Sequence, residues 1–307
     1  MKVFKYLTPE RVDVLKDRYI RFTQAIYLND PFESLPFISK LMSDFESSAF
    51  YGKSINPILN EIENRKLSIN DIPEEFREKI PQEVLNYITS LTIKDGLELL
   101  PEIHPAKITK LLLSSSAEDL KINISAKIKQ SWNKIFGILS LSQINNNITM
   151  WSHYAKNHEG YVIEFDPENE FFNKKKNIND PFGFLRSVNY SNKRPVLELV
   201  NFSKPDNEFI ESIAQQILYT KSEDWANEKE LRLICNLSEF DKKISIEGQE
   251  IYLFSFPPIA IKAIYIGVNA SISTIETIEN ILKNDGYEHV NILHGELDLK
   301  EFKIIFN

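Results

Sequence analysis

The sequence predicts an α+β fold with a mixed, mostly antiparallel central sheet system and a helical insertion at roughly residues 36–132. Short segments with the pattern of strands occur on both sides of that insertion, and helical periodicity is concentrated inside it. Because the helices cluster and do not follow each strand in turn, a parallel α/β sheet is not expected. We therefore expect a single α+β domain over residues 1–307, in which 36–132 forms a helical insertion or cap lobe.

Four elements are expected before the insertion. The segment VFKYL at 3–7 is apolar and β-prone, and YIRFTQ at 19–24 alternates as a strand does. Between them, Thr8 can cap a helix and Pro9 suits its first position. The segment LNDPFE at 28–33 predicts a turn, because Asn, Asp and Pro each favour non-helical backbone.

The insertion and the elements after it are predicted from the same periodicities. Helical repeats with proline breaks cover the insertion, beginning with PFISKLMSDFESSAF at 36–50. We expect strands afterwards in FGILSLS (136–142), GYVIEFD (160–166), LRSVNYS (185–191), EKELRLICNL (228–237), IAIKAIYIGV (259–268) and EFKIIFN (301–307). A short helix or loop is expected in NITMWSHYA (147–155), and helices at 207–221 and in SISTIETIENILKND (271–285).

Composition excludes several classes of protein. The chain of 307 residues has 42% hydrophobic and 26% charged residues, which is typical of a globular protein. A formal net charge of -8 does not support nucleic acid binding, although a local basic groove is compatible with it. One cysteine, Cys235, excludes an internal disulfide framework and suits a reducing compartment. No segment is apolar enough to span a membrane, so we expect a soluble cytoplasmic protein, and the sequence does not indicate its oligomeric state.

The segment DWANEKELRLIC at 224–235 places charged residues at every second position. On a strand, Glu228, Glu230 and Arg232 share one face, and apolar residues occupy the other. The charged face is either an exposed Glu–Arg ladder or the wall of a cleft. Trp225 lies just upstream and is costly to expose, which favours the cleft.

A second candidate segment is TMWSHYAKNHEGYVIEFD at 149–166. Trp151, His153 and Tyr154 combine aromatic rings with polar atoms, as pocket linings do, and Glu164 follows on the next strand. The alternative is that these residues pin a helix to the sheet. His153 and His158 are five residues apart, which is poor spacing for a shared metal, and no metal is expected.

These motifs occur together in a known family. In this order, YLTPE, RFTQAIYLNDPFE, SLSQINNNITMWSHYAKNHEGYVIEFD and KSEDWANEKELRLI resemble the bacterial family catalogued as domain of unknown function 2971. The resemblance covers roughly residues 1–33 and 136–307 and leaves the helical middle as a variable insertion. Its most specific motifs are Asn29-Asp30-Pro31-Phe32-Glu33, Trp151-Ser152-His153-Tyr154, and Trp225 through Glu228 and Glu230 to Arg232.

The chain is also loosely similar to ADP-ribosyltransferase folds, in which NAD lies in a cleft between two small sheets. This resemblance implies an enzyme in which a carboxylate stabilises the positive charge of a breaking glycosidic bond. The catalytic residues that it implies are Glu230, Glu228 and His153. The NAD-binding residues that it implies are Tyr6, Ser140, Ser142, Trp151, Tyr154 and Arg232, supported by Asn29, Asp30, Glu33, Glu164 and Trp225.

Two features depart from that pattern. Lys5 and Tyr6 occupy the first strand, where an Arg or a His is typical, and Arg232 could neutralise Glu230.

Three functions therefore stay open. The first is an NAD-dependent ADP-ribosyltransferase or NAD glycohydrolase acting in phage defence or as a toxin, and the second is a non-enzymatic defence module that senses a nucleotide or a partner. The third is a metal-dependent hydrolase or nuclease using Asp30, Glu33 and Glu164, whose convergence the sequence does not show.

Overall fold

The computed structural model describes residues 1–41, 66, 82, 86, 89–90, 117–175, 180, 182–199, 207–284 and 286–307. Of the helical insertion expected at roughly 36–132, most of residues 42–116 lies outside the described residues. The chain divides into two compact units. Unit 1 comprises Met1–Pro36, Ser125–Pro195 and Glu211–Asn307, and unit 2 comprises Phe37–Ile124 and Val196–Ile210.

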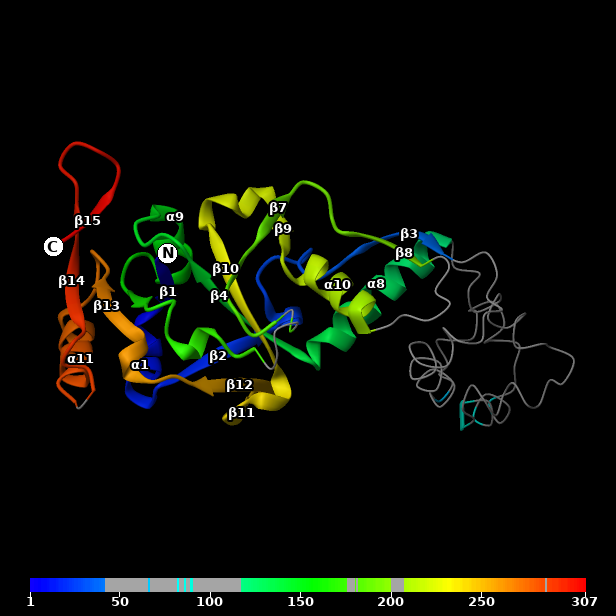
Figure 1. The fold of residues 1–307 in the computed structure, drawn as a ribbon, viewed down its shortest axis with the longest axis horizontal. Helices are drawn as coiled ribbons and strands as arrows, with labels where there is room; N and C mark the ends of the chain where they lie inside the picture. Colours follow the sequence, from blue (N-terminus) through cyan, green and yellow to red (C-terminus); the bar gives the residue numbers. More distant parts are fainter. Residues whose placement is uncertain are drawn as a thin grey trace, which may run out of the picture. The chain divides into compact units, whose positions relative to one another are not determined.

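Unit 1 contains a large sheet in which all described pairings except one are antiparallel, as predicted (Figure 1). Its central order is β2-β4-β1-β5-β13, and β10 pairs with the other edge of β4. The strands are β1 (Val3–Leu7), β2 (Tyr19–Gln24), β4 (Phe136–Ser142), β5 (Tyr161–Phe165), β6 (Arg186–Ser187), β10 (Glu230–Asn236), β11 (Lys242–Ile246), β12 (Gln249–Ser255), β13 (Ile261–Ile266), β14 (Asn291–Leu297) and β15 (Ile304–Phe306). The parallel pair is β13 with β14.

A second, two-stranded parallel ladder joins β7 (Asn189–Ser191) to β9 (Thr220–Ser222) in unit 1. The helix expected at 207–221 therefore ends early, and its last residues form β9. The described helices are α1 (Asp13–Asp17), α8 (Ala117–Asn133), α9 (Ile148–Tyr154), α10 (Asn207–Leu218) and α11 (Ile272–Leu282). No described helix is both long and apolar enough to cross a membrane.

Unit 2 includes a correction to the expected helical insertion. Residues Phe37–Leu41 form strand β3, which pairs in parallel with β8 (Val196–Leu199). The segment was expected to be helical because its apolar positions fit a helix. Its pairing partner lies more than 150 residues further along the chain, which no local pattern reveals.

The main core of unit 1 packs against one face of the sheet. Leu139 and Leu141 of β4 lie beside Leu231 and Leu233 of β10, and all four are buried in one apolar cluster. The alternation along both strands produces this shared face, because successive side chains point to opposite sides of a sheet. The residues between these leucines consequently face the other side of the sheet, where the charged residues of β10 lie.

Helix α9 is held against β1 by a second apolar cluster. Trp151 of α9 is fully buried in it, and its indole ring meets the ring of Tyr6 edge-on at 5.5 Å between centroids. The Asn147 side chain caps the helix by accepting a hydrogen bond from the Met150 N–H at 3.0 Å. This packing fixes the direction of the next residues of α9, including Tyr154.

Candidate functional site

A cavity of about 220 Å³ lies where β1 and β2 separate along one edge of β4. Strand β10 occupies the opposite edge of β4 with a continuous ladder from Phe136 to Ser142. On the shared edge, β2 pairs with β4 only near Ile138, and β1 pairs with it only at Ser142. The sheet is therefore open beside Ser140, and the cavity occupies that opening.

A buried lysine joins two carboxylates on the wall of the cavity. The Lys221 ammonium lies 2.6 Å from Glu228 Oε2 and 2.9 Å from Glu230 Oε2. All three side chains are buried. Burial alone lowers the pKa of Lys221, but the charges of Glu230 and Glu228 outweigh it and hold the pKa above its usual value. Lys221 is therefore a fixed cation, and burial raises the pKa of Glu230.

Arg232 forms the next layer behind Glu230. Its side chain is fully buried, and its Nε donates to Glu230 Oε1 at 2.7 Å while Nη2 binds a carboxylate oxygen of Glu33. Its Nη1 donates to the Leu218 carbonyl oxygen at 2.5 Å. The sequence left open an exposed Glu–Arg ladder or a cleft wall; Glu230 and Arg232 do pair, but on a buried face. Burial lowers the pKa of Arg232 to about 9.

Tyr154 connects α9 to the same group of charges. Its hydroxyl donates to Glu228 Oε1 at 2.6 Å and accepts a hydrogen bond from Asn29 Nδ2 at 2.7 Å. Burial, together with the Glu228 carboxylate, raises the pKa of the Tyr154 phenol. Glu228 belongs to a 3-10 helix (Glu223–Glu228) that precedes β10, so it is not on the strand with Glu230 as expected. The two carboxylates converge through Lys221 instead.

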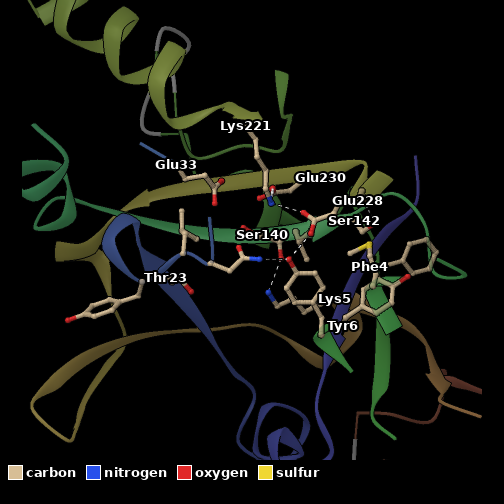
Figure 2. Close-up of a pocket in the computed structure, with 16 residues that line it drawn as sticks. Phe4, Lys5, Tyr6, Thr23, Glu33, Ser140, Ser142, Lys221, Glu228 and Glu230 are labelled. Atoms are coloured by element: carbon tan, nitrogen blue, oxygen red, sulfur yellow. Dashed lines mark hydrogen bonds and ion pairs between the residues drawn. The ribbon is translucent and has the colours of Figure 1, made fainter. Parts of the chain in front are cut away.

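Lys5 faces the cavity from β1. Its Nζ donates to the Ser140 carbonyl oxygen at 2.8 Å, in the opening between β1 and β2. Figure 2 shows Lys5 reaching toward Ser140 from one side of the cavity, while Lys221, Glu228 and Glu230 lie together on the other. Burial lowers the pKa of Lys5 to about 8, although the charge of Glu230 opposes this shift.

Most of the predicted site residues are brought together here. Contacts already described join Asn29, Glu33, Tyr154, Glu228, Glu230 and Arg232 into one network. Tyr6, Ser140 and Ser142 line the cavity. The Tyr6 hydroxyl donates to the Ile144 carbonyl oxygen at 2.9 Å, and Ser142 Oγ donates to the Glu228 carbonyl oxygen at 2.7 Å. The Trp225 ring lies 4.9 Å from Lys221 Nζ, which places it beside the same cation.

Six predicted residues do not line the cavity. Arg232 and Trp225 still contact its charged groups, and the other four have different roles or positions. Trp151 is fully buried and its Nε1 donates to the Asn145 carbonyl oxygen at 2.6 Å, so it pins α9 to the sheet and has no ring surface for a ligand. His153 is exposed. Glu164 accepts a hydrogen bond from the Tyr265 hydroxyl, and Asp30 accepts one from the Phe32 N–H at 2.8 Å, which makes the Asp30 segment a turn.

Lys221 is the main functional residue that sequence reasoning missed. It stands in the KSEDW segment of the family resemblance, directly before the residues that were selected. The signal that points to it is its position seven residues before Glu228 and nine before Glu230, within the same motif. Among the described residues, no group of three or more His, Cys, Asp or Glu side chains is placed to hold a metal ion.

A comparison with protein families agrees with the motifs. Residues 150–233 match the model of the family described as "Protein of unknown function (DUF2971)". The matched stretch runs from α9 into β10 and contains both Tyr154 and Glu228–Arg232. No curated protein and no solved structure matches the chain significantly. The resemblance to this family is therefore confirmed over residues 150–233, and the family's description assigns no function.

Proposed function

We propose that unit 1 binds NAD in this cavity and cleaves the bond between nicotinamide and ribose, either transferring ADP-ribose or releasing it to water. The observation that carries the proposal is the Glu228 carboxylate, which lies on the cavity wall and is held there by Tyr154 and Lys221. When the C1′–N bond breaks, nicotinamide leaves as a neutral molecule and positive charge develops on the ribose. A fixed carboxylate stabilises that charge without reorganisation.

Glu228 suits this role better than Glu230, which the sequence favoured. Glu230 is bound by two cations, because Arg232 contacts both of its oxygens and Lys221 contacts one. Glu228 is bound by one cation, Lys221, and by the neutral hydroxyl of Tyr154. The negative potential that reaches the cavity from Glu228 is therefore less neutralised, and Glu230 instead holds Lys221 in place.

The lining of the cavity fits a ring and a sugar. Tyr6 and Tyr27 contribute aromatic surface, and Asn29, Ser142 and Tyr154 contribute groups that can bind hydroxyls or an amide. A cavity of about 220 Å³ accommodates the nicotinamide and its ribose but not a whole dinucleotide. The adenosine part would consequently extend from the opening.

A second candidate, a nucleotide-binding module without enzymatic activity, is favoured by one observation. Each cavity carboxylate already has a cationic partner, which limits the negative potential available for catalysis. One experiment separates the two functions. Purified protein is titrated with NAD by calorimetry, and nicotinamide release and transfer of labelled ADP-ribose to lysate proteins are followed in parallel.

Binding with release or transfer supports the enzyme. Heat of binding with no release and no transfer supports the module. The absence of heat, release and transfer contradicts NAD as the ligand in both.

A further inference from the structure

We propose that Lys5 is a reactive amine that captures small hydroxylated aldehydes in this cavity as imines. The inference concerns a different reaction of the same cavity and does not depend on NAD cleavage. It is carried by the contrast between two lysines, Lys5 and Lys221, whose amines face one cavity from opposite sides (Figure 2).

The partners of the two amines differ in charge. Lys221 Nζ is held by two carboxylates, whereas Lys5 Nζ donates to the Ser140 backbone carbonyl at 2.8 Å. A carboxylate stabilises the ammonium form, but a neutral carbonyl accepts a hydrogen bond from an ammonium or a neutral amine. The geometry therefore keeps Lys221 protonated and permits a neutral Lys5, which agrees with their opposite pKa shifts.

Lys5 is also placed where a ligand can reach it. The sheet is open beside Ser140 because β1 and β2 pair with different ends of β4. Lys5 is half-buried and lines the cavity in that opening. An amine that is free to lose its proton and faces a cavity is the nucleophile that Schiff-base chemistry requires.

The reaction is balanced without an oxidant. The neutral Lys5 nitrogen adds to the aldehyde carbon, and the resulting carbinolamine loses one water as the carbon–nitrogen double bond forms. The oxygen of that water is the aldehyde oxygen, and its two hydrogens replace the two that the neutral amine loses, so no electron is gained or lost. Imine formation is reversible, so without a reductant the free protein and the imine are in equilibrium.

The other cavity groups select for hydroxylated aldehydes. The Asn29 amide and the Tyr154 hydroxyl can bind alcohol groups, and the Glu228 carboxylate accepts hydrogen bonds from them. A plain alkyl aldehyde makes none of these contacts. Glyceraldehyde is small enough for the cavity and carries two hydroxyls, and propanal is its matched apolar control.

The test is reductive trapping followed by peptide mapping. The full chain is incubated with glyceraldehyde and cyanoborohydride at neutral pH, and the adduct on each lysine is measured over time by mass spectrometry. At pH 7.5 an amine with a pKa near 8 is neutral about 200-fold more often than an ordinary lysine. We expect Lys5 to be modified on the order of 100-fold faster than exposed Lys2, and Lys221 to stay unmodified.

Two comparisons make the test decisive. The Lys5 to Lys2 ratio of modification rates should fall when propanal replaces glyceraldehyde, and the Lys5→Met variant should lose the fast adduct that Lys2→Met retains. Labelling of Lys5 no faster than Lys2 would overturn the proposal in the native chain, whether or not the variants fold. Equal ratios for the two aldehydes would overturn the selectivity for hydroxyls.

Discussion

The Tyr154 hydroxyl donates a hydrogen bond of 2.6 Å to Oε1 of Glu228 and joins two motifs that lie 74 residues apart. The same hydroxyl is bound by Asn29 from a third motif. These two hydrogen bonds require α9, the loop of Asn29 and the segment before β10 to hold fixed positions relative to one another.

Replacing Arg232 by Met should lower the free energy of unfolding by about 3–5 kcal/mol. The substitution leaves the buried carboxylates of Glu33 and Glu230 without their guanidinium. Urea unfolding of Arg232→Met and of the native chain measures the loss. The matched control is Arg11→Met, which removes an exposed pair with Asp13 and should cost at most about 1 kcal/mol. Equal losses in the two variants would show that the buried network is not the source of the stability.

The pH dependence of stability should reveal Lys5. Its pKa is about 8 in the folded chain and near its ordinary 10.5 when unfolded. Between these pH values the unfolded chain holds a proton that the folded chain has released, so rising pH favours the folded state. Below pH 8 both states hold the proton, and the folded chain carries the full cost of its desolvated ammonium. The native chain should therefore gain stability relative to Lys5→Met as the pH rises from 8 to 10.5.

Urea midpoints at pH 7, 8, 9 and 10 measure this difference. Lys2→Met is the control, because Lys2 is exposed, and its difference from the native chain should not change in the same direction. A difference for Lys5→Met that is constant over this range contradicts the lowered pKa.

Gly160→Ala should destabilise the chain by about 3 kcal/mol, at the upper end of overpacking costs. A Cβ at this position would lie 2.1 Å from the Leu7 carbonyl oxygen, which belongs to the backbone and cannot rotate away. Gly248→Ala is the control for conformation alone, because its φ is +79° and nothing lies within 4 Å of an added Cβ. Thermal or urea unfolding should show a clearly larger loss for Gly160→Ala, and the opposite order would contradict the close approach of β1 and β5.

The strands around the site are predictable because each buries one face or both. Alternation in YIRFTQ and in FGILSLS reflects a side-chain period of two, which is visible without any partner. Strand β3 is not predictable in this way, since its apolar residues also fit a helix and its pairing with β8 is distant in sequence. Strand β11 carries mostly exposed side chains, so its pattern is weak.

The candidate site is predictable as a set of residues but not as a set of contacts. Motif order identified Tyr154, Glu228, Glu230 and Arg232, all of which converge. Their contacts differ from those expected, because Glu228 and Glu230 are joined by Lys221 and do not lie on the same strand. Lys221 lies on β9, whose partner β7 is set by tertiary pairing. No periodicity in the sequence encodes that position.

The most direct test of the account is nicotinamide release by the native chain and by Glu228→Gln. The substitution keeps the shape of the side chain and removes its charge, so the rate should fall on the order of 100- to 1000-fold while the chain stays folded. Glu250→Gln, on the exposed part of β12, is the matched control and should release nicotinamide at the native rate. Release by Glu228→Gln at the native rate, or no release by the native chain, would contradict the proposed role of Glu228.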